Sequence, residues 1–294
     1  MKALVFGSMN VDLVFKVSSI VEEGQTISAS SMAKNAGGKG ANQAIALAQA
    51  GMKTYLAASI GPDGLFLEDM LKDKGVDTSL VTHLDSPSGQ AIIQVDSKGR
   101  NCIIVLSGAN GNVSEALIDE KLSGFRKNDW LVLENEIPMI DAIAAKAKAK
   151  GMKVCLNPSP ANEAARAVDP ADVDLLIVNE AEAEFLAQKK DMDYPEILQC
   201  LGQIYETAEI VLTASSKGAC SIDESGAFVM VSSPKVKVVD TTGAGDTFLG
   251  YYLCLRSEGS SIEESLEGAC YAASLACTKM GAARSIPSRS ELDF

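Results

Sequence analysis

An aspartate that follows a glycine-rich turn is the residue of this chain whose setting most suggests catalysis. Residues 238–248 read VVDTTGAGDTF, a β-branched run that ends in Asp240, a turn of small residues and then helical spacing from Asp246. We predict a strand, a tight turn and a helix N-terminus. The unpaired amides there, those of Gly243, Ala244 and Gly245, would bind a phosphate group, and Asp246 could then accept a proton from an attacking hydroxyl. The alternative is that Asp246 only starts a helix and the glycines only form a turn.

A second glycine-rich segment precedes another helix near the N-terminus. Residues 35–44 read NAGGKGANQA and lead into apolar residues at helical spacing, which end at Gly51. The segment lacks the G-x-x-x-x-G-K-[ST] pattern of a P-loop. Backbone amides at Gly38 and its neighbours, together with the Asn42 side chain, could instead hold a small polyhydroxy ligand. A tight loop before a helix is the other reading.

Polar residues follow apolar strand-like runs along the whole chain. Runs such as 3–6, 130–136, 153–156, 174–178 and 209–212 alternate with helical segments, which favours a doubly wound, mainly parallel α/β sheet. The carboxyl ends of such strands share one edge, where ligands bind. The polar residues expected at that edge are Asn10, Asp12, Glu136, Asn157, Asn179, Glu182, Thr213 and Asp240. As isolated residues they could equally be turn formers and caps.

Two pieces of the chain have the short alternating pattern of β-hairpins. They cover about 13–36 and 89–107, and we predict that they form a small antiparallel sheet inserted into a single domain of residues 1–294. This sheet could be a lid over the site or an edge at which two copies meet. Its apolar residues on both faces, Ile92, Ile93, Ile103 and Ile104, favour a homodimer through the lid.

The composition excludes several classes of protein. The net charge of −13 comes without a basic block, which argues against nucleic acid or an anionic membrane as partner. The absence of a long uncharged apolar run and of a signal-peptide pattern predicts a soluble, cytoplasmic protein. The seven cysteines are scattered, so neither a disulfide framework nor a zinc site is indicated. With a single histidine, His83, any general base is expected to be a carboxylate.

Taken together and in this order, the motifs resemble those of the ribokinase (PfkB) family of carbohydrate kinases. The resemblance rests on GSMNVD at 7–12, NAGGKGANQA at 35–44, NEAE at 179–182 and VVDTTGAGDTF at 238–248, and it covers essentially the whole chain. It implies an ATP-dependent kinase of ribokinase-like fold that phosphorylates the primary 5-hydroxyl of D-ribose to give ribose 5-phosphate. It also implies the use of Mg²⁺ and K⁺.

The resemblance also implies a role for each matching residue. Asp246 would be the base, and the amides of Gly243, Ala244, Gly245 and Asp246 would form the anion hole. The sugar would be held by Asn10, Asp12, Gly38, Lys39, Asn42 and Glu136. The nucleotide site would include Asn179, Thr213, Gly218, Gly245 and Cys270, with Glu182 near Mg²⁺ and the phosphates. The oxygen ligands of K⁺ would come from Asp240, Thr242, Ala276, Lys279, Gly281 and Ser285.

Two features depart from the family pattern, and other functions stay open. Cys270 stands where Asn or His is common, and the segment after Thr213 is poorer in glycine. The alternatives within the family are a nucleoside kinase and a kinase of another sugar. The alternative from a different class is a non-catalytic sugar-binding regulator on the same fold.

Overall fold

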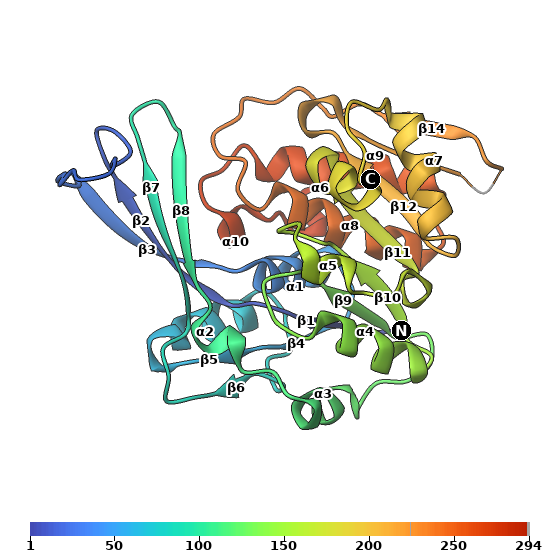
Figure 1. The fold of residues 1–294 in the computed structure, drawn as a ribbon, viewed down its shortest axis with the longest axis horizontal. Helices are drawn as coiled ribbons and strands as arrows, with labels where there is room; N and C mark the ends of the chain where they lie inside the picture. Colours follow the sequence, from blue (N-terminus) through green and yellow to red (C-terminus); the bar gives the residue numbers. More distant parts are fainter. Residues whose placement is uncertain (224, 293–294) are drawn as a thin grey trace.

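An eight-stranded sheet forms the centre of the molecule (Figure 1). The structure is a computed structural model that describes residues 1–223 and 225–292, so the last two residues of the predicted domain lie outside it. Parallel pairs join six of its strands, which are β4, β1, β9, β10, β11 and β12. Antiparallel pairs add β13 and β14 at one edge. In spatial order the strands are β14 (Phe228–Val231), β13 (Ala219–Ile222), β12 (Glu209–Thr213), β11 (Leu175–Asn179), β10 (Lys153–Leu156), β9 (Trp130–Leu133), β1 (Ala3–Phe6) and β4 (Thr54–Ala57).

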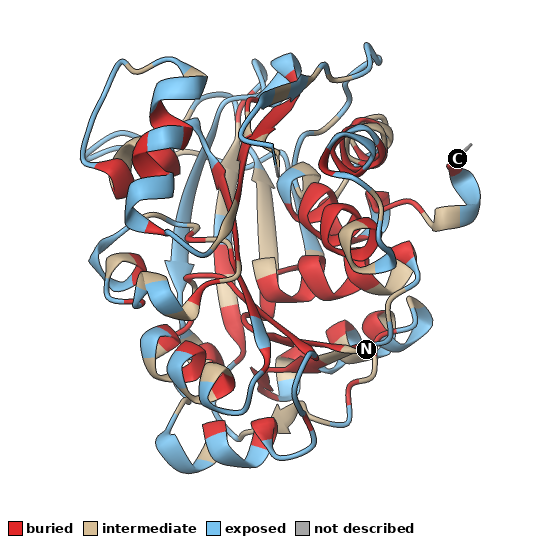
Figure 2. Cartoon of the chain, turned by 90° about the vertical axis from the view of Figure 1, so that its right-hand side faces the viewer, coloured by how far each residue is buried: buried red, intermediate tan, exposed pale blue. Residues whose placement is uncertain are grey.

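Helices cover both faces of this sheet, as strand β1 illustrates. Its side chains alternate, so that Ala3 and Val5 enter one hydrophobic core while Leu4 and Phe6 enter the other. Figure 2 shows the buried residues gathered along the sheet and on the inner sides of the helices. An all-apolar strand is therefore explained by burial on both faces, and the predicted mainly parallel α/β architecture is confirmed.

The helices divide between these two cores. Helices α1, α2, α8 and α9 contribute to the core of Ala3 and Val5, and α3, α4, α6 and α7 contribute to the other. The α-helices are α1 (Lys39–Ala50), α2 (Leu65–Asp73), α3 (Glu115–Leu122), α4 (Ile140–Ala149), α5 (Glu163–Arg166), α6 (Glu180–Ala187), α7 (Tyr194–Ile204), α8 (Ala244–Glu258), α9 (Ile262–Ala276) and α10 (Ala282–Ser285). Short 3₁₀ helices lie at Pro62–Gly64, Gly108–Gly111, Pro170–Asp172, Ser215–Lys217 and Arg289–Glu291.

A second, four-stranded sheet projects from the side of the body (Figure 1). We call it the lid. Its two outer pairings are antiparallel, and the middle pairing of β2 with β7 is parallel. The predicted small sheet is therefore present, although one of its three pairings is parallel rather than antiparallel. In spatial order its strands are β3 (Ser31–Gly37), β2 (Asn10–Lys16), β7 (Gly89–Val95) and β8 (Asn101–Leu106), and a separate pair is formed by β5 (Ser59–Ile60) and β6 (Thr82–His83).

Three predicted boundaries were wrong. The run ending at Asp240 is not a strand, because Val238 and Val239 are 59% and 48% exposed and the Val239 N–H donates to the Cys277 carbonyl rather than to a neighbouring strand. The strand expected through Glu136 ends at Leu133. Asn10 and Asp12, expected in a loop, belong to β2, because the chain pairs with β3 immediately.

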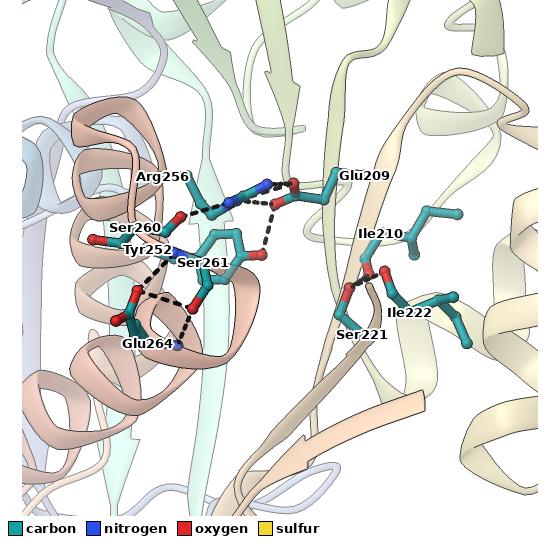
Figure 3. Close-up of polar contacts among 9 residues, drawn as sticks. All are labelled: Glu209, Ile210, Ser221, Ile222, Tyr252, Arg256, Ser260, Ser261 and Glu264. Atoms are coloured by element: carbon teal, nitrogen blue, oxygen red, sulfur yellow. Dashed lines mark hydrogen bonds and ion pairs between the residues drawn. The ribbon is translucent and has the colours of Figure 1, made fainter. Parts of the chain in front are cut away.

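Polar contacts fix helix α8 against the sheet at the end remote from Asp246. Arg256 pairs with Glu209 of β12 at 2.6 Å, and the Tyr252 hydroxyl donates to the same carboxylate at 2.6 Å (Figure 3). The next helix, α9, begins with a capping box in which Ser261 and Glu264 bond reciprocally. These contacts set how α8 lies on the sheet, and therefore where its first turn emerges. Within the described residues, we find no helix of sufficient length and apolarity to cross a membrane.

Candidate active site

The carboxylate of Asp246 lies buried in the first turn of α8, between two amide side chains of α1. Asn42 donates to its Oδ2 and Gln43 donates to its Oδ1, each at 3.1 Å. Asn42 and Gln43 reach the same carboxylate because they are adjacent on a helix that packs against α8. The carboxylate therefore has a fixed orientation, which a general base needs.

The N-terminus of α8 presents free amide groups beside this carboxylate. Gly243 adopts the left-handed conformation, with φ 78°, and turns the chain into the helix. The Ala244 N–H donates to the Thr241 carbonyl, whereas the N–H groups of Gly245 and Asp246 have no acceptor among the described residues. A Cβ at Gly245 would meet nothing within 4 Å, so the first turn is open on the side of this glycine's Cα. The arrangement suits a phosphoryl group: of the four predicted amides, that of Ala244 is engaged in the turn, and among the described residues those of Gly243, Gly245 and Asp246 have no acceptor.

Glu136 brings three of the predicted sugar-binding residues together. Its Oε2 accepts hydrogen bonds from the Asn10 side chain at 3.4 Å and from the backbone N–H of Lys39 at 3.3 Å. It also accepts from the Ser8 hydroxyl at 2.6 Å. Asn10 is held in turn by Asn110, whose amide donates to it at 2.7 Å. The β1–β2 loop, β2, α1 and the β9–α4 loop therefore meet at one carboxylate.

Asp12 lies against a glycine of the neighbouring lid strand. A Cβ at Gly37 would overlap the Asp12 carboxylate, and one at Gly38, where φ is 95°, would lie 2.8 Å from the backbone N of Asn10. Burial raises the pKa of Asp12 to about 7, and the negative charge of Glu136 adds to the shift. The glycines thus leave room for a carboxyl group that can exist in either protonation state near neutral pH.

Lys39 supplies positive charge between the carboxylates. Burial acts to lower its pKa, but the carboxylates of Asp246 and Glu136 outweigh this effect, so the pKa lies above its ordinary value. The ammonium group therefore stays charged within the influence of the Asp246 and Glu136 carboxylates.

Two buried acceptor atoms face no donor from the chain. Among the described residues, Asn42 Oδ1 and Gln43 Oε1 have no hydrogen-bond partner. Both side-chain amides donate an N–H to Asp246, and this orientation leaves their oxygens unpaired. Buried polar atoms are normally paired, so these oxygens fit a ligand that carries hydroxyl donors.

Three of the predicted nucleotide residues, Asn179, Glu182 and Thr213, lie at the carboxyl ends of β11 and β12. Asn179 and Glu182 form a capping box at the start of α6, with both bonds at 2.9 Å, and Thr213 pairs with Asn179 across the strands. At Gly218, where φ is 111°, a Cβ would overlap the Val231 carbonyl oxygen. Cys270 is nearly fully buried in α9, and burial raises its thiol pKa to about 12. Nucleotide contacts by these residues stay a prediction.

The predicted cation loop is organised by Asp240. Its Oδ1 accepts from the Thr242 N–H at 3.0 Å and hydroxyl at 2.6 Å, and its Oδ2 accepts from the Gly281 N–H at 2.9 Å. Burial acts to raise the Asp240 pKa, but these hydrogen bonds outweigh it and hold the pKa below its usual value. A fixed negative charge fits a cation here.

The other predicted cation ligands lie further along the chain. The Ala276 carbonyl accepts from the Lys279 N–H at 3.1 Å, the Lys279 ammonium pairs with Glu291, and the Ser285 hydroxyl donates to the Ala282 carbonyl. Within the described residues, no group of three or more His, Cys, Asp or Glu side chains could hold a metal ion. Cation binding by these residues, mostly through backbone carbonyls, stays a prediction.

Comparison with known proteins identifies the family. The model of the pfkB family of carbohydrate kinases matches residues 1–289. The chain belongs to this family. It is similar to the ribokinase of Haemophilus influenzae, with 32% identity over 99% of this chain and 97% of that protein. Among solved structures, Arabidopsis thaliana ribokinase complexed with ribose and ATP is 30% identical with a TM-score of 0.86, covering 98% of this chain and 96% of that one. Thermotoga maritima ribokinase is 31% identical with a TM-score of 0.88, covering 99% and 97%. These likenesses confirm the ribokinase-like fold.

Some residues of this pfkB-family site were not predicted from the sequence. Gln43 was not among the predicted site residues, although it donates to Asp246 and, at 3.2 Å, to Asn157. Its position one helical turn after Lys39 was the available signal, because residues four apart share a helix face. Ser8 lies inside the GSMNVD motif, whereas nothing in the sequence around Asn110 separates it from an ordinary loop residue.

Proposed function

We propose that this pfkB-family kinase is a ribokinase, which transfers the γ-phosphoryl group of ATP to the 5-hydroxyl of D-ribose. The observation that carries the proposal is the Asp246 carboxylate, held by Asn42 and Gln43 beside two free amides at the start of α8. The full-length similarity to a ribokinase complexed with ribose and ATP supports ribose as the acceptor.

The proposed mechanism is in-line transfer. The sugar is held by Asn10, Asp12, Gly38, Lys39, Asn42 and Glu136. Asp246 accepts the proton of the 5-hydroxyl as that oxygen bonds to the γ-phosphorus, and the bond from that phosphorus to the ADP oxygen breaks. The amides of Gly245 and Asp246, together with Lys39, stabilise the charge that develops on the phosphoryl oxygens. No phosphoenzyme is required.

Two cations belong to the proposal. Mg²⁺ neutralises phosphate oxygens of ATP when bound, and Glu182 is the proposed residue near it. K⁺ is proposed for the loop of Asp240, Thr242, Ala276, Lys279, Gly281 and Ser285, where it would stabilise the turn that carries the anion hole. The ionised Asp240, bonded to Thr242 and Gly281, supports this assignment.

An ADP-release assay with Mg²⁺ tests the function and the K⁺ site together. Purified protein is assayed with ribose, 2-deoxyribose, fructose, adenosine and uridine, each with and without K⁺. We expect ribose-dependent ADP release that increases with K⁺. Turnover only with adenosine or uridine would instead identify a nucleoside kinase. Ribose binding without turnover of any acceptor would identify a sugar-binding regulator.

The lid carries an apolar strip that we propose as a homodimer interface. Four consecutive residues of β8 are more than half exposed: Ile103 51%, Ile104 58%, Val105 57% and Leu106 55%. An exposed apolar edge strand tends to pair with the edge strand of another chain unless a partner covers it. A second copy of the lid would cover it.

We expect Ile104→Lys to separate the dimer, because it places a charge in the centre of the strip. The molar mass from light scattering at micromolar concentration should fall from that of a dimer to that of a monomer. Ile204→Lys, at a 40% exposed site on α7, is the matched control and should leave the mass unchanged. A wild-type monomer, or a dimer that persists in the Ile104→Lys protein, would contradict the proposed interface.

We also propose that residues 1–294 act as one kinase domain in the cytoplasm. The lid strands β2 and β3 lead directly out of β1 and into α1, which supports one unit. All seven cysteines are free thiols, which suits a reducing compartment.

A further inference from the structure

Asn110 carries a buried side-chain amide at the point where the lid returns to the body. It lies in the 3₁₀ helix Gly108–Gly111, which follows lid strand β8. Asn110 and Asn10 are only 4% and 3% exposed. The lid strand beside Asn10 leaves the space for their contact, because a Cβ at Gly89 would overlap both Asn110 Nδ2 and Asn10 Oδ1. Asn110 was not among the residues predicted to touch the sugar.

A backbone group fixes which way the Asn110 amide points. The Met9 N–H donates to Asn110 Oδ1 at 3.0 Å. A backbone N–H can only donate, so the side-chain atom that faces it must be the oxygen. The Asn110 NH₂ group therefore lies on the other side of the amide, where it donates to Asn10 Oδ1 at 2.7 Å.

The orientation of the Asn10 amide follows from that of Asn110. Because Asn10 Oδ1 accepts the Asn110 N–H, the Asn10 NH₂ group faces Glu136 of the proposed sugar site and donates to its Oε2 at 3.4 Å. Within the part of the chain that the structure describes, this NH₂ group has no second acceptor. Asn10 therefore offers a sugar an N–H donor, and its oxygen is already used.

This donor matters because the side chains around it mostly offer acceptors. Glu136 and Asp12 carry carboxyl groups on this side of the site. The side-chain oxygens of Asn42 and Gln43 are unpaired. A sugar hydroxyl can donate to such oxygens while it accepts an N–H from Asn10. If the Asn10 amide were turned by 180°, its oxygen would face the Glu136 carboxylate and the donor would be lost.

We propose that Asn110 is a positioning residue that holds the Asn10 amide with its NH₂ group toward the sugar. The hydrogen bond from Asn110 to Asn10 Oδ1 carries this role, and the Met9 N–H fixes its direction. The inference rests on the proposed function, because it takes ribose as the ligand. It deepens that function by assigning a role in sugar recognition to a residue that does not touch the sugar.

The Asn110→Asp variant tests the assignment with almost no change in shape. The aspartate still accepts the Met9 N–H but cannot donate to Asn10, whose NH₂ group should turn toward the new carboxylate. In steady-state ADP release the KM for ribose should rise roughly tenfold, which corresponds to about one hydrogen bond. We expect kcat to stay within about threefold of wild type, because Asp246 is untouched and the loss is one of binding.

Two further variants separate the lost donor from other effects of the change. Asn110→Leu is neutral and of similar volume, and it also lacks the donor, so it should raise the KM for ribose as well. Asn112→Asp adds the same negative charge at an exposed residue two positions away and should keep the wild-type KM.

A second background shows whether the effect passes through Asn10. In an Asn10→Ala protein Asn110 has no amide to orient, so adding Asn110→Asp should change kcat/KM for ribose by less than about twofold. This ratio is measured with dilute ribose and needs no saturation. If Asn110 only helped the loop to fold, Asn110→Asp would lower kcat/KM by the same factor in both backgrounds.

Side-chain amide signals test the contact without any sugar. In ¹⁵N-labelled protein the NH₂ signals of Asn110 and Asn10 are assigned from their loss in Asn110→Asp and in Asn10→Ala. The Asn10 signal should shift in Asn110→Asp, because its NH₂ group then faces a carboxylate. It should keep its position in Asn112→Asp.

These measurements separate the inference from the proposed function. If the wild type does not phosphorylate ribose, the proposed substrate is wrong, and the amide signals alone decide whether Asn110 orients Asn10. If ribose is phosphorylated but Asn110→Asp keeps the wild-type KM, or has its full effect in the Asn10→Ala protein too, the inference is overturned. An Asn10 signal that does not move in Asn110→Asp would overturn it as well.

Discussion

Replacing Asp246 by Asn is expected to lower kcat for ribose by roughly two or more orders of magnitude. Asparagine keeps the size of the side chain but cannot accept the proton of the sugar hydroxyl. In the wild type Asn42 and Gln43 each donate to one oxygen of Asp246. Asparagine would place its NH₂ group opposite one of these two donors, so one hydrogen bond would be lost. The measurement is steady-state ADP release, with ribose affinity followed separately by calorimetry.

Asp141→Asn is the matched control for this prediction. Asp141 is exposed in the first turn of α4, where it has the same helical setting as Asp246 but no place in the site. The control should keep wild-type kcat, and both variants should unfold within a few degrees of the wild type. An Asp246→Asn protein that is folded and turns over ribose at near the wild-type rate would show that Asp246 is not the base.

Replacing Gly250 by Ala is expected to destabilise the protein by about 3 kcal/mol and to lower activity as well. Gly250 lies on α8 where it crosses α1, and a Cβ there would come within 2.6 Å of the Ala46 carbonyl carbon and 2.7 Å of the Leu47 N. Because these are backbone atoms of α1, which cannot rotate away as a side chain can, α1 and α8 must move apart. The melting temperature should fall by roughly 5 °C.

The activity loss follows from the same movement. Helix α8 carries Asp246 and α1 carries Asn42 and Gln43, so separating the helices lengthens the bonds that orient the base. Gly202→Ala is the matched control, because a Cβ there meets nothing within 4 Å and alanine is the better helix former. A Gly250→Ala protein as stable as the control would contradict the close approach of α1 and α8.

Patterns that repeat along the chain predicted the architecture, because they report burial. The apolar runs predicted as strands at 3–6 and 130–136 are strands covered on both faces, the second ending at Leu133, and the polar residues after them meet at one edge, as Asn10 and Glu136 do. The strand predicted before Asp240 was wrong because that apolar run is exposed rather than buried. Valines at 238 and 239 have the composition of a strand, yet no neighbouring strand among the described residues pairs with them.

Residues that act through others were the hardest to predict. Gln43 reaches the Asp246 carboxylate, and Glu134, just after β9, reaches the Ser8 N–H, only because distant segments pack together: α1 against α8, and β9 beside β1. Their residue types are ordinary for a helix and for a strand end. Motifs reveal the groups that touch a ligand, whereas positioning groups are specified by tertiary packing that one sequence does not display.

Product analysis by phosphorus NMR tests the proposed reaction most directly. Purified protein is incubated with ribose, ATP, Mg²⁺ and K⁺, and the phosphorus of the new ester is correlated with the protons of the sugar. We expect one ester per ADP formed, with its phosphorus coupled to the two protons on C5 of ribose. Release of ADP with inorganic phosphate only, or an ester formed only when a nucleoside replaces ribose, would contradict the assignment of this chain as a ribokinase.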